Sequence, residues 1–280
     1  MPAAEAFGHS FAAGVGCASQ TADCLRHVRV ADLVHNFPTA AIPGVIDGKI
    51  LTESIGAALA HGRFARVPIL NGINQDEELI FVAGLRLAVS GGMFVPVPAP
   101  VTPDSYQTDI AAVLGVLSPE RAAAVAAEYP LNAYPAPVLA FSTLVSDANF
   151  ACTALQVDRW TSERAPTFAY EFDDGNAPQR FAPPGELPPI ATHSSEYQYL
   201  FDLPNAPFPG TLNPDQQALA ATMRSAWTSF SATGDPSTVS LWPSFGLVGS
   251  VVSLVPPQPM VETDFSAVHQ CAFWAALPTS

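Results

Sequence analysis

Basic residues are scarce in this chain. Lysine and arginine together number 11, against 25 aspartate and glutamate residues, which gives a formal net charge of −14. A field of that sign repels phosphate backbones and anionic headgroups, so the composition excludes nucleic acid and anionic membranes as partners. The same charge favours solubility, and it also allows cationic ligands to concentrate near the surface.

Long apolar runs are absent as well. No uninterrupted run approaches the roughly 20 residues that cross a bilayer, so we expect no membrane span. Residues 1–10 have no basic stretch leading into an apolar one, and no signal peptide is visible. Hydrophobic residues nevertheless make up 49% of the 280 positions, enough for a sizeable core in one large or two small domains.

Cysteine is also sparse, with four residues in two groups. Cys17 and Cys24 flank a short polar segment that a disulfide can close, whereas Cys152 and Cys271 are far apart and can join two distant helices. Neither group has the C-x-x-C spacing of a zinc site. The residues alone leave two alternatives open, namely two disulfides formed in an oxidising compartment, or four reduced and partly buried cysteines.

Periodicity and punctuation predict a mixed architecture. Apolar and β-branched runs bounded by turn residues predict strands at 67–72 and 167–172. Helical spacing predicts two short helices within 4–34 and further helices at 104–117, 118–128, 138–163, 213–233 and 264–276. Prolines interrupt 91–103, and 241–255 resembles short hairpin pieces. Strands separated by helices predict an α/β sheet, and two strands are so few for this length that the sheet is expected to be incomplete.

Two short segments contain residues able to do chemistry. Glu77 follows the strand predicted at 67–72, and the carboxyl end of a strand is where α/β proteins build their sites. A carboxylate there can orient a histidine and support its charge. The alternative is a solvated acidic turn that caps the next helix. Among six histidines, only His193 lies on a loop between a predicted strand and an aromatic segment, and its alternative role is that of a hydrogen-bonding surface residue.

Together these segments resemble those of a known family. Residues 71–77, Asn-Gly-Ile-Asn-Gln-Asp-Glu, resemble the G-x-N-x-D-E-G acid motif of type-B carboxylesterases, and 193–201 resemble the family's H-x-x-E histidine motif. Further similarity, in the same order as in the family, occurs at 146–152, 230–236, 241–245 and 269–274. Glu78 stands where the motif has glycine, so we expect its side chain and charge to disturb the turn.

The resemblance implies that residues 1–280 form the C-terminal portion of a single type-B carboxylesterase domain. Its fold would be a partial α/β-hydrolase fold, the C-terminal part of the sheet with its helices. Glu77 would be the triad acid and His193 the general base. The family also bridges cysteines at both places, which implies the disulfides Cys17–Cys24 and Cys152–Cys271 and a secreted or periplasmic protein. No metal or organic cofactor is implied.

The family's nucleophile elbow, G-E-S-A-G, and its glycine-rich H-G-G-G oxyanion loop do not occur in the sequence. The nearest approach, residues 8–12 (Gly-His-Ser-Phe-Ala), lacks the final glycine, and no apolar strand precedes Ser10. Ser90 also lacks the G-x-S context. We therefore expect an ester-hydrolase family member that carries the triad acid and histidine but is inactive alone.

The expected partners follow from this interpretation. They are a small carboxylic ester, if an N-terminal half completes the site, and a chain that covers the open edge of the sheet. Two other functions stay open at this stage. One is a non-catalytic esterase-like binding or interaction module, and the other is a different hydrolase that uses Ser10 or another serine as its nucleophile.

Overall fold

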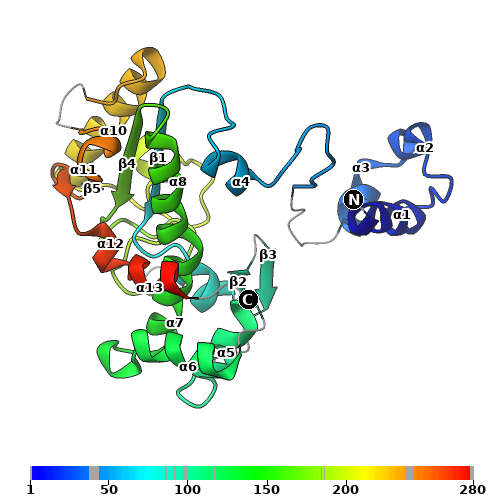
Figure 1. Ribbon diagram of the computed structural model, residues 1–280, viewed down its shortest axis with the longest axis horizontal. Coiled ribbons are helices and arrows are strands. Elements are labelled where there is room, and N and C mark those ends of the chain that lie inside the picture. Colours follow the sequence, from blue (N-terminus) through cyan, green and yellow to red (C-terminus); the bar gives the residue numbers. More distant parts are fainter. Residues whose placement is uncertain are drawn as a thin grey trace. The chain divides into compact units, whose positions relative to one another are not determined.

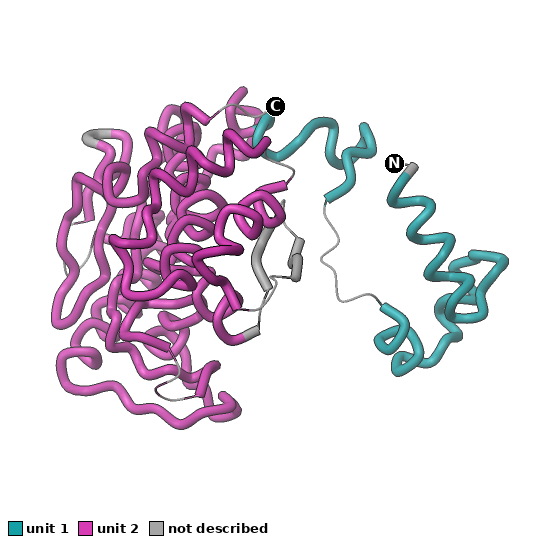
Figure 2. Tube along the Cα trace, turned by 90° about the horizontal axis from the view of Figure 1, so that it is seen from below, with its two compact units in different colours: residues 1–58 teal, residues 59–280 magenta. Residues whose placement is uncertain are grey.

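The computed structural model describes residues 2–37, 44–85, 87–90, 93–96, 100–115, 118–183, 185, 187–237 and 242–277. The chain divides into two compact units, residues 1–58 and residues 59–280 (Figure 2). Each unit is described below by itself. The helix α4, Ile55–Ala60, contains the boundary between them.

Residues 2–37 of unit 1, which the structure describes, form three helices where two were predicted. They are α1, Pro2–Gly14, α2, Ala22–His27, and α3, Val30–Asn36. Thr21 caps α2 by accepting a hydrogen bond from the amide of Cys24. The helices α2 and α3 are separate because Val28 and Arg29 both have extended backbone. The disulfide Cys17–Cys24 is present and joins the loop after α1 to α2.

Unit 2 is built on a mostly parallel sheet, which confirms the predicted α/β class. Within the described residues the sheet has four strands in the order β1-β4-β5-β6 (Figure 1). The strands β1, Ile69–Asn74, β4, Thr167–Phe172, and β5, Val251–Leu254, are parallel. The strand β6, Met260–Glu262, pairs antiparallel with β5.

Two of these strands correct the sequence interpretation. β4 coincides with its prediction and β1 lies two residues beyond it, but β5 and β6 were not predicted as sheet strands. Of the hairpin pieces predicted within 241–255, the described residues contain one arm, β5, whose antiparallel partner β6 lies beyond this range. They contain a short helix, α11, Phe245–Val248, followed by β5. Prolines also did not exclude strands from 91–103, because β3, Met93–Pro96, pairs with β2, Leu87–Ser90, and its proline is the last residue.

Helices cover both faces of the main sheet. The helix predicted at 138–163 is a continuous helical run formed by α7, Pro137–Ser146, a π-helical turn η3, Asp147–Ala151, and α8, Cys152–Ser162. Leu155 of α8 packs with Ala169 of β4 on one face. Leu219 of α10, Pro214–Thr233, packs with Phe168 on the other. Adjacent residues of β4 thus point to opposite layers, as the pleat requires.

The remaining elements surround this centre. They are η1, Ile80–Leu85, α5, Tyr106–Val113, α6, Pro119–Glu128, η2, Leu131–Ala133, α9, Tyr197–Leu200, α12, Phe265–Val268, and α13, Cys271–Ala276. The single helix predicted at 264–276 is therefore two, because Gln270 has left-handed backbone (φ 52°) and interrupts it. The helix predicted at 104–117 is shorter, and residues 116–117 lie outside the described part.

One helical run is long and apolar enough to cross a membrane. It spans 26 residues, Pro137–Ser162, with a mean hydropathy of 1.4 over its most apolar window, half of which is buried. Length and composition alone do not distinguish a membrane span from the core helix of a soluble protein. The absence of a membrane span stays a prediction.

Candidate active site

Glu77 and His193 lie 116 positions apart in the sequence, and the fold brings their side chains into direct contact. The Nδ1 of His193 donates a hydrogen bond of 2.6 Å to Oε2 of Glu77. The two segments run side by side just before this contact, where the amide of Asp76 donates to the carbonyl of Ala191 at 2.9 Å. Asp76 and Thr192 form a parallel bridge there. The two residues selected from the sequence therefore form one hydrogen-bonded pair.

The turn after β1 orients the Glu77 carboxylate. Its other oxygen, Oε1, accepts a hydrogen bond of 2.8 Å from the backbone amide of Asn74, the last residue of the strand. Glu77 is only 6% exposed, so a solvated acidic turn does not describe it. Each oxygen thus has a fixed donor, one from the strand end and one from the imidazole.

The imidazole of His193 combines partial burial with access to solvent. Its side chain is 38% exposed, and the ring of Phe81 in η1 lies beside it with centroids 5.0 Å apart. The hydrogen bond that His193 donates to Glu77 raises the pKa of His193, burial lowers it, and the negative charges of Glu77, Glu196 and Glu78 raise it further. The net result is a histidine whose pKa lies above its ordinary value. Among the described residues, only its Nδ1 has a hydrogen-bond partner, and Nε2 is left for others.

The loop that carries His193 is fixed by its own turn. The amide of Ser195 donates to the carbonyl of Thr192 at 3.0 Å, and the amide of Thr192 donates to Oγ of Ser195 at 3.1 Å. Ser194 has left-handed backbone (φ 69°), which is uncommon outside glycine and closes the turn directly after the histidine. Glu196, two residues further along, accepts a hydrogen bond of 2.7 Å from the side-chain amide of Asn74. Burial raises the pKa of Glu196.

Asp76 is a site residue that sequence reasoning missed. It is 3% exposed, and its Oδ1 accepts hydrogen bonds from Oγ of Ser142 at 2.5 Å, Oγ of Ser146 at 2.8 Å and the amide of Leu79 at 3.0 Å. Burial raises the pKa of Asp76 to about 6, against the lowering effect of these hydrogen bonds. Two serines four positions apart on an apolar helix were the available signal, because that spacing puts both hydroxyls on one face.

The contact between Glu77 and His193 is present although Glu78 stands where the motif has glycine. Its side chain is fully buried, and its backbone amide donates to Oγ of Ser146 at 2.9 Å. Among the described residues, Glu78 is not one of the non-glycine positions with positive φ. The backbone at this position therefore does not require glycine.

The serines considered from the sequence do not form a nucleophile elbow. Ser10 lies within α1 on an exposed part of the helix, and Ser90 is the last residue of β2. An elbow needs a tight strand-to-helix turn, and neither serine follows a strand into a helix. Within the ranges that the structure describes, no three His, Cys, Asp or Glu side chains converge as metal ligands.

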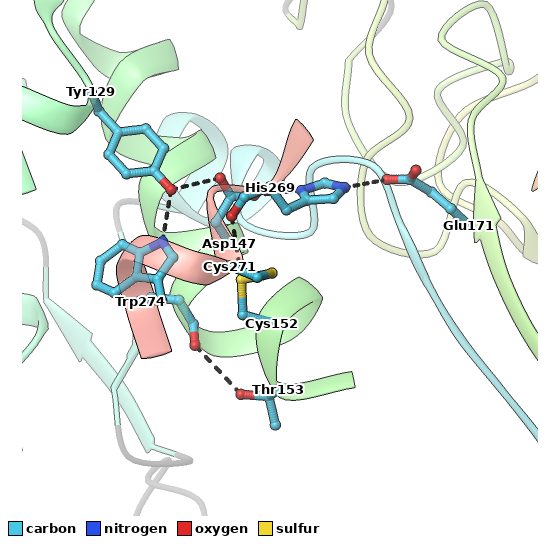
Figure 3. Close-up of a disulfide and its surroundings, with 9 residues drawn as sticks. Tyr129, Asp147, Cys152, Thr153, Glu171, His269, Cys271 and Trp274 are labelled. Atoms are coloured by element: carbon cyan, nitrogen blue, oxygen red, sulfur yellow. Dashed lines mark hydrogen bonds and ion pairs between the residues drawn. A yellow bond between two sulfur atoms is a disulfide. The ribbon is translucent and has the colours of Figure 1, made fainter. Parts of the chain in front are cut away.

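A second histidine cluster is buried away from solvent (Figure 3). The imidazole of His269 donates from Nδ1 to Asp147 at 2.5 Å and from Nε2 to Glu171 at 2.8 Å. Burial alone lowers the pKa of His269, but the bonds to the two carboxylates outweigh it and raise the pKa to about 10. The disulfide Cys152–Cys271 is present beside this cluster. Both ring nitrogens of His269 are hydrogen-bonded to carboxylates, and the residue is only 3% exposed. We therefore assign His269 a structural role.

Comparisons with known proteins agree with the likeness of the motifs. A family model described as the carboxylesterase family matches residues 2–274. The acylcarnitine hydrolase of Rattus norvegicus is 27% identical over 227 residues, which cover 79% of this chain and 39% of the relative. The cocaine esterase of Homo sapiens is 27% identical over 273 residues (91% and 45%), and carboxylesterase 3 of Pongo abelii is 25% identical over 281 residues (91% and 46%). The chain spans less than half the length of these relatives.

Proposed function

The chain belongs to the carboxylesterase family, and on that premise we propose that it supplies the acid and the general base of a carboxylic-ester hydrolase. Its mostly parallel sheet with flanking helices is part of that family's α/β-hydrolase fold. The acid is Glu77 and the base is His193. The observation that carries the proposal is the 2.6 Å hydrogen bond between a buried carboxylate and a partly exposed imidazole.

The proposed chemistry follows from which nitrogen is occupied. Because Nδ1 of His193 donates to Glu77, the neutral ring has its free lone pair on Nε2. Nε2 takes the proton from an attacking hydroxyl and later returns it to the leaving alkoxide. Glu77 keeps this tautomer in place and stabilises the imidazolium formed in between. The raised pKa of His193 makes it a stronger base, at the cost of being protonated to a higher pH.

The nucleophile is proposed to come from another polypeptide segment. The printed sequence has no G-x-S-x-G, and without the nucleophile a serine hydrolase loses about 10⁶ of its rate enhancement. The strand β1 offers a place for the missing segment. Within the described residues it pairs with β4 on one side only, and the open edge of a strand accepts a further strand through backbone hydrogen bonds. A strand added there would end beside Glu77.

The proposed substrate class is a small, uncharged carboxylic ester. The relatives are named as hydrolases and esterases, which supports hydrolysis as the reaction type. Disulfides persist in oxidising compartments, so the two in this chain support a secreted or periplasmic location.

Ester turnover tests the proposal. Purified chain is assayed with 4-nitrophenyl acetate, alone and together with a polypeptide that carries a family H-G-G-G loop and G-E-S-A-G elbow. The coding sequence upstream of Met1 is the first place to look for such a segment. We expect no turnover by the chain alone, and turnover by the pair that His193→Ala and Glu77→Gln abolish.

Two results would overturn the proposal. Hydrolysis by the chain alone that His193→Ala abolishes would contradict the need for a second segment, and Ser10→Ala then tests whether this serine is the nucleophile. Binding of a macromolecular partner that both His193→Ala and Glu77→Ala leave unchanged, with no turnover by the pair, would favour the alternative of a non-catalytic binding module.

A further inference from the structure

Asp76 has a role that the acid and base assignment does not use. It directly precedes Glu77, and its carboxylate points away from His193 into the protein, toward the hydroxyls of α7. Thr143 of the same helix adds a longer contact of 3.3 Å to the second oxygen of Asp76. Burying a carboxylate is costly unless hydrogen bonds compensate for the lost water. Three hydroxyl groups of α7 provide this compensation for Asp76, and the arrangement calls for a reason why a carboxylate is placed there.

The turn that contains Glu77 is anchored on both sides of that residue by the same helix. Before Glu77, the Asp76 carboxylate accepts from Ser142 and Ser146. After Glu77, the backbone amide of Glu78 donates to the same Oγ of Ser146. Ser146 therefore links both flanks of the acid, because its hydroxyl donates to one and accepts from the other. The backbone bond from Asp76 to Ala191 anchors the turn to the histidine loop as well.

We propose that Asp76 is a positioning residue that, together with Ser146, holds the turn so that the Glu77 carboxylate meets Nδ1 of His193. Hydrogen bonds to a charged acceptor are roughly twice as strong as neutral ones, which suits a carboxylate for fixing a short turn. A displacement of about 1 Å at a catalytic group is enough to lower the rate about 100-fold. The hydrogen bond between Glu77 and His193 is 2.6 Å long, so a shift of that size in the turn would break it. This inference rests on the proposed roles of Glu77 and His193.

A purely structural role is the alternative. The bond from the Leu79 amide to Asp76 resembles a helix cap at the start of η1. A cap alone would make Asp76 matter for stability and leave the state of His193 unaffected. The two roles therefore differ in a measurable property of the imidazole.

The test measures how readily His193 is modified by diethyl pyrocarbonate, which reacts with the neutral ring. The modification rate of His193 is followed across pH by mass spectrometry of dilute full-length chain, with the exposed His27 as an internal standard in each sample. The midpoint for wild-type His193 is expected above that of an ordinary histidine. Glu77→Gln is expected to lower this midpoint, because the substitution weakens the hydrogen bond that raises the pKa of His193.

Asp76→Asn and Ser146→Ala are expected to lower the midpoint by at least half as much as Glu77→Gln does. Ser146→Ala changes no charge, so its effect reports geometry alone, and as a single-hydroxyl deletion it keeps the test available if Asp76→Asn does not fold. Asp109→Asn is the matched control. Asp109 is a buried aspartate that accepts from a serine hydroxyl in another part of unit 2, and its substitution is expected to leave the midpoint unchanged.

Two outcomes are decisive and distinguishable. If Glu77→Gln lowers the midpoint while Asp76→Asn and Ser146→Ala only destabilise the fold, the positioning role is wrong and the acid and base pair stands. If Glu77→Gln itself leaves the midpoint unchanged, the proposed pair fails, and with it the role of Asp76.

Discussion

At the scale of single residues, three polar side chains divide into those that local sequence reveals and those that only the fold reveals. Glu77 and His193 were predicted because each lies in a short motif with a recognisable neighbourhood. His269 was missed because its importance depends on Asp147 and Glu171, which lie 122 and 98 positions away in the chain. No local pattern records a contact of that range, and a lone histidine in a predicted helix carries no signal of burial.

The His269 cluster predicts a specific loss of stability. Removing one partner of a buried ion pair costs about 3–5 kcal/mol, because uncompensated charge stays behind. His269→Gln leaves two buried carboxylates without their cation, so we expect a decrease of that size in the free energy of unfolding at pH 7. Urea unfolding of dilute chain measures it. His27→Gln, at an exposed histidine of α2, is the control and is expected to change stability little.

The pH dependence of unfolding supplies a second measure of the same cluster. The pKa of His269 is raised to about 10 in the folded chain and is about 6.5 when unfolded. The folded state therefore binds the proton more tightly, and this stabilisation is complete below about pH 6.5 and is lost as the pH rises toward 10. Wild type is expected to lose stability over that interval more steeply than His269→Gln. Parallel slopes for the two proteins would show that the imidazole is not charged when folded.

At the scale of elements, the sequence predicts those helices and strands whose ends are marked by residues typical of a helix cap or a turn. The helix α10 begins at a capping box between Asn213 and Gln216 and ends at Gly234, whose backbone is left-handed (φ 78°). The strands β5 and β6 have four and three residues. Strands so short exist because a neighbour pairs with them, and that information is tertiary.

The strand β1 contains a glycine whose role is set by packing. A Cβ built on Gly72 would lie 2.5 Å from the ring of Tyr170, the residue opposite it in β4. Gly72→Ala therefore forces the ring or the strand to move, and overpacking of this kind costs about 1–3 kcal/mol. Denaturant unfolding is expected to show that loss. Gly84→Ala is the control, since a Cβ there meets nothing within 4 Å, and equal losses in both variants would contradict the explanation by packing.

At the scale of the whole chain, two observations bear on the proposed missing segment. Among the described strands, β1 lies at the edge of the main sheet, with β4 as its neighbour (Figure 1). The chain covers 39–46% of the length of relatives to which it is similar. Unit 1 contributes exposed apolar side chains as well, among them Val30, Val34 and Ile50. The sequence indicated an incomplete sheet, but which strand would be at its edge could not be known before the strand order was.

An open parallel edge predicts self-association of the chain when it is produced alone. Unpaired edge strands and exposed apolar surface both favour it, so light scattering is expected to detect oligomers or aggregates that the completing polypeptide suppresses. Val67→Lys tests the location. Val67 is 56% exposed just before β1, and a lysine beside an edge strand disfavours pairing without entering the core. This variant is expected to remain monomeric at higher concentration than wild type. Val30→Lys, in unit 1, is measured in the same way and shows how much the exposed apolar side chains of that unit contribute to association. A wild-type chain that is monodisperse and melts cooperatively as a monomer would contradict the requirement for a partner at this edge.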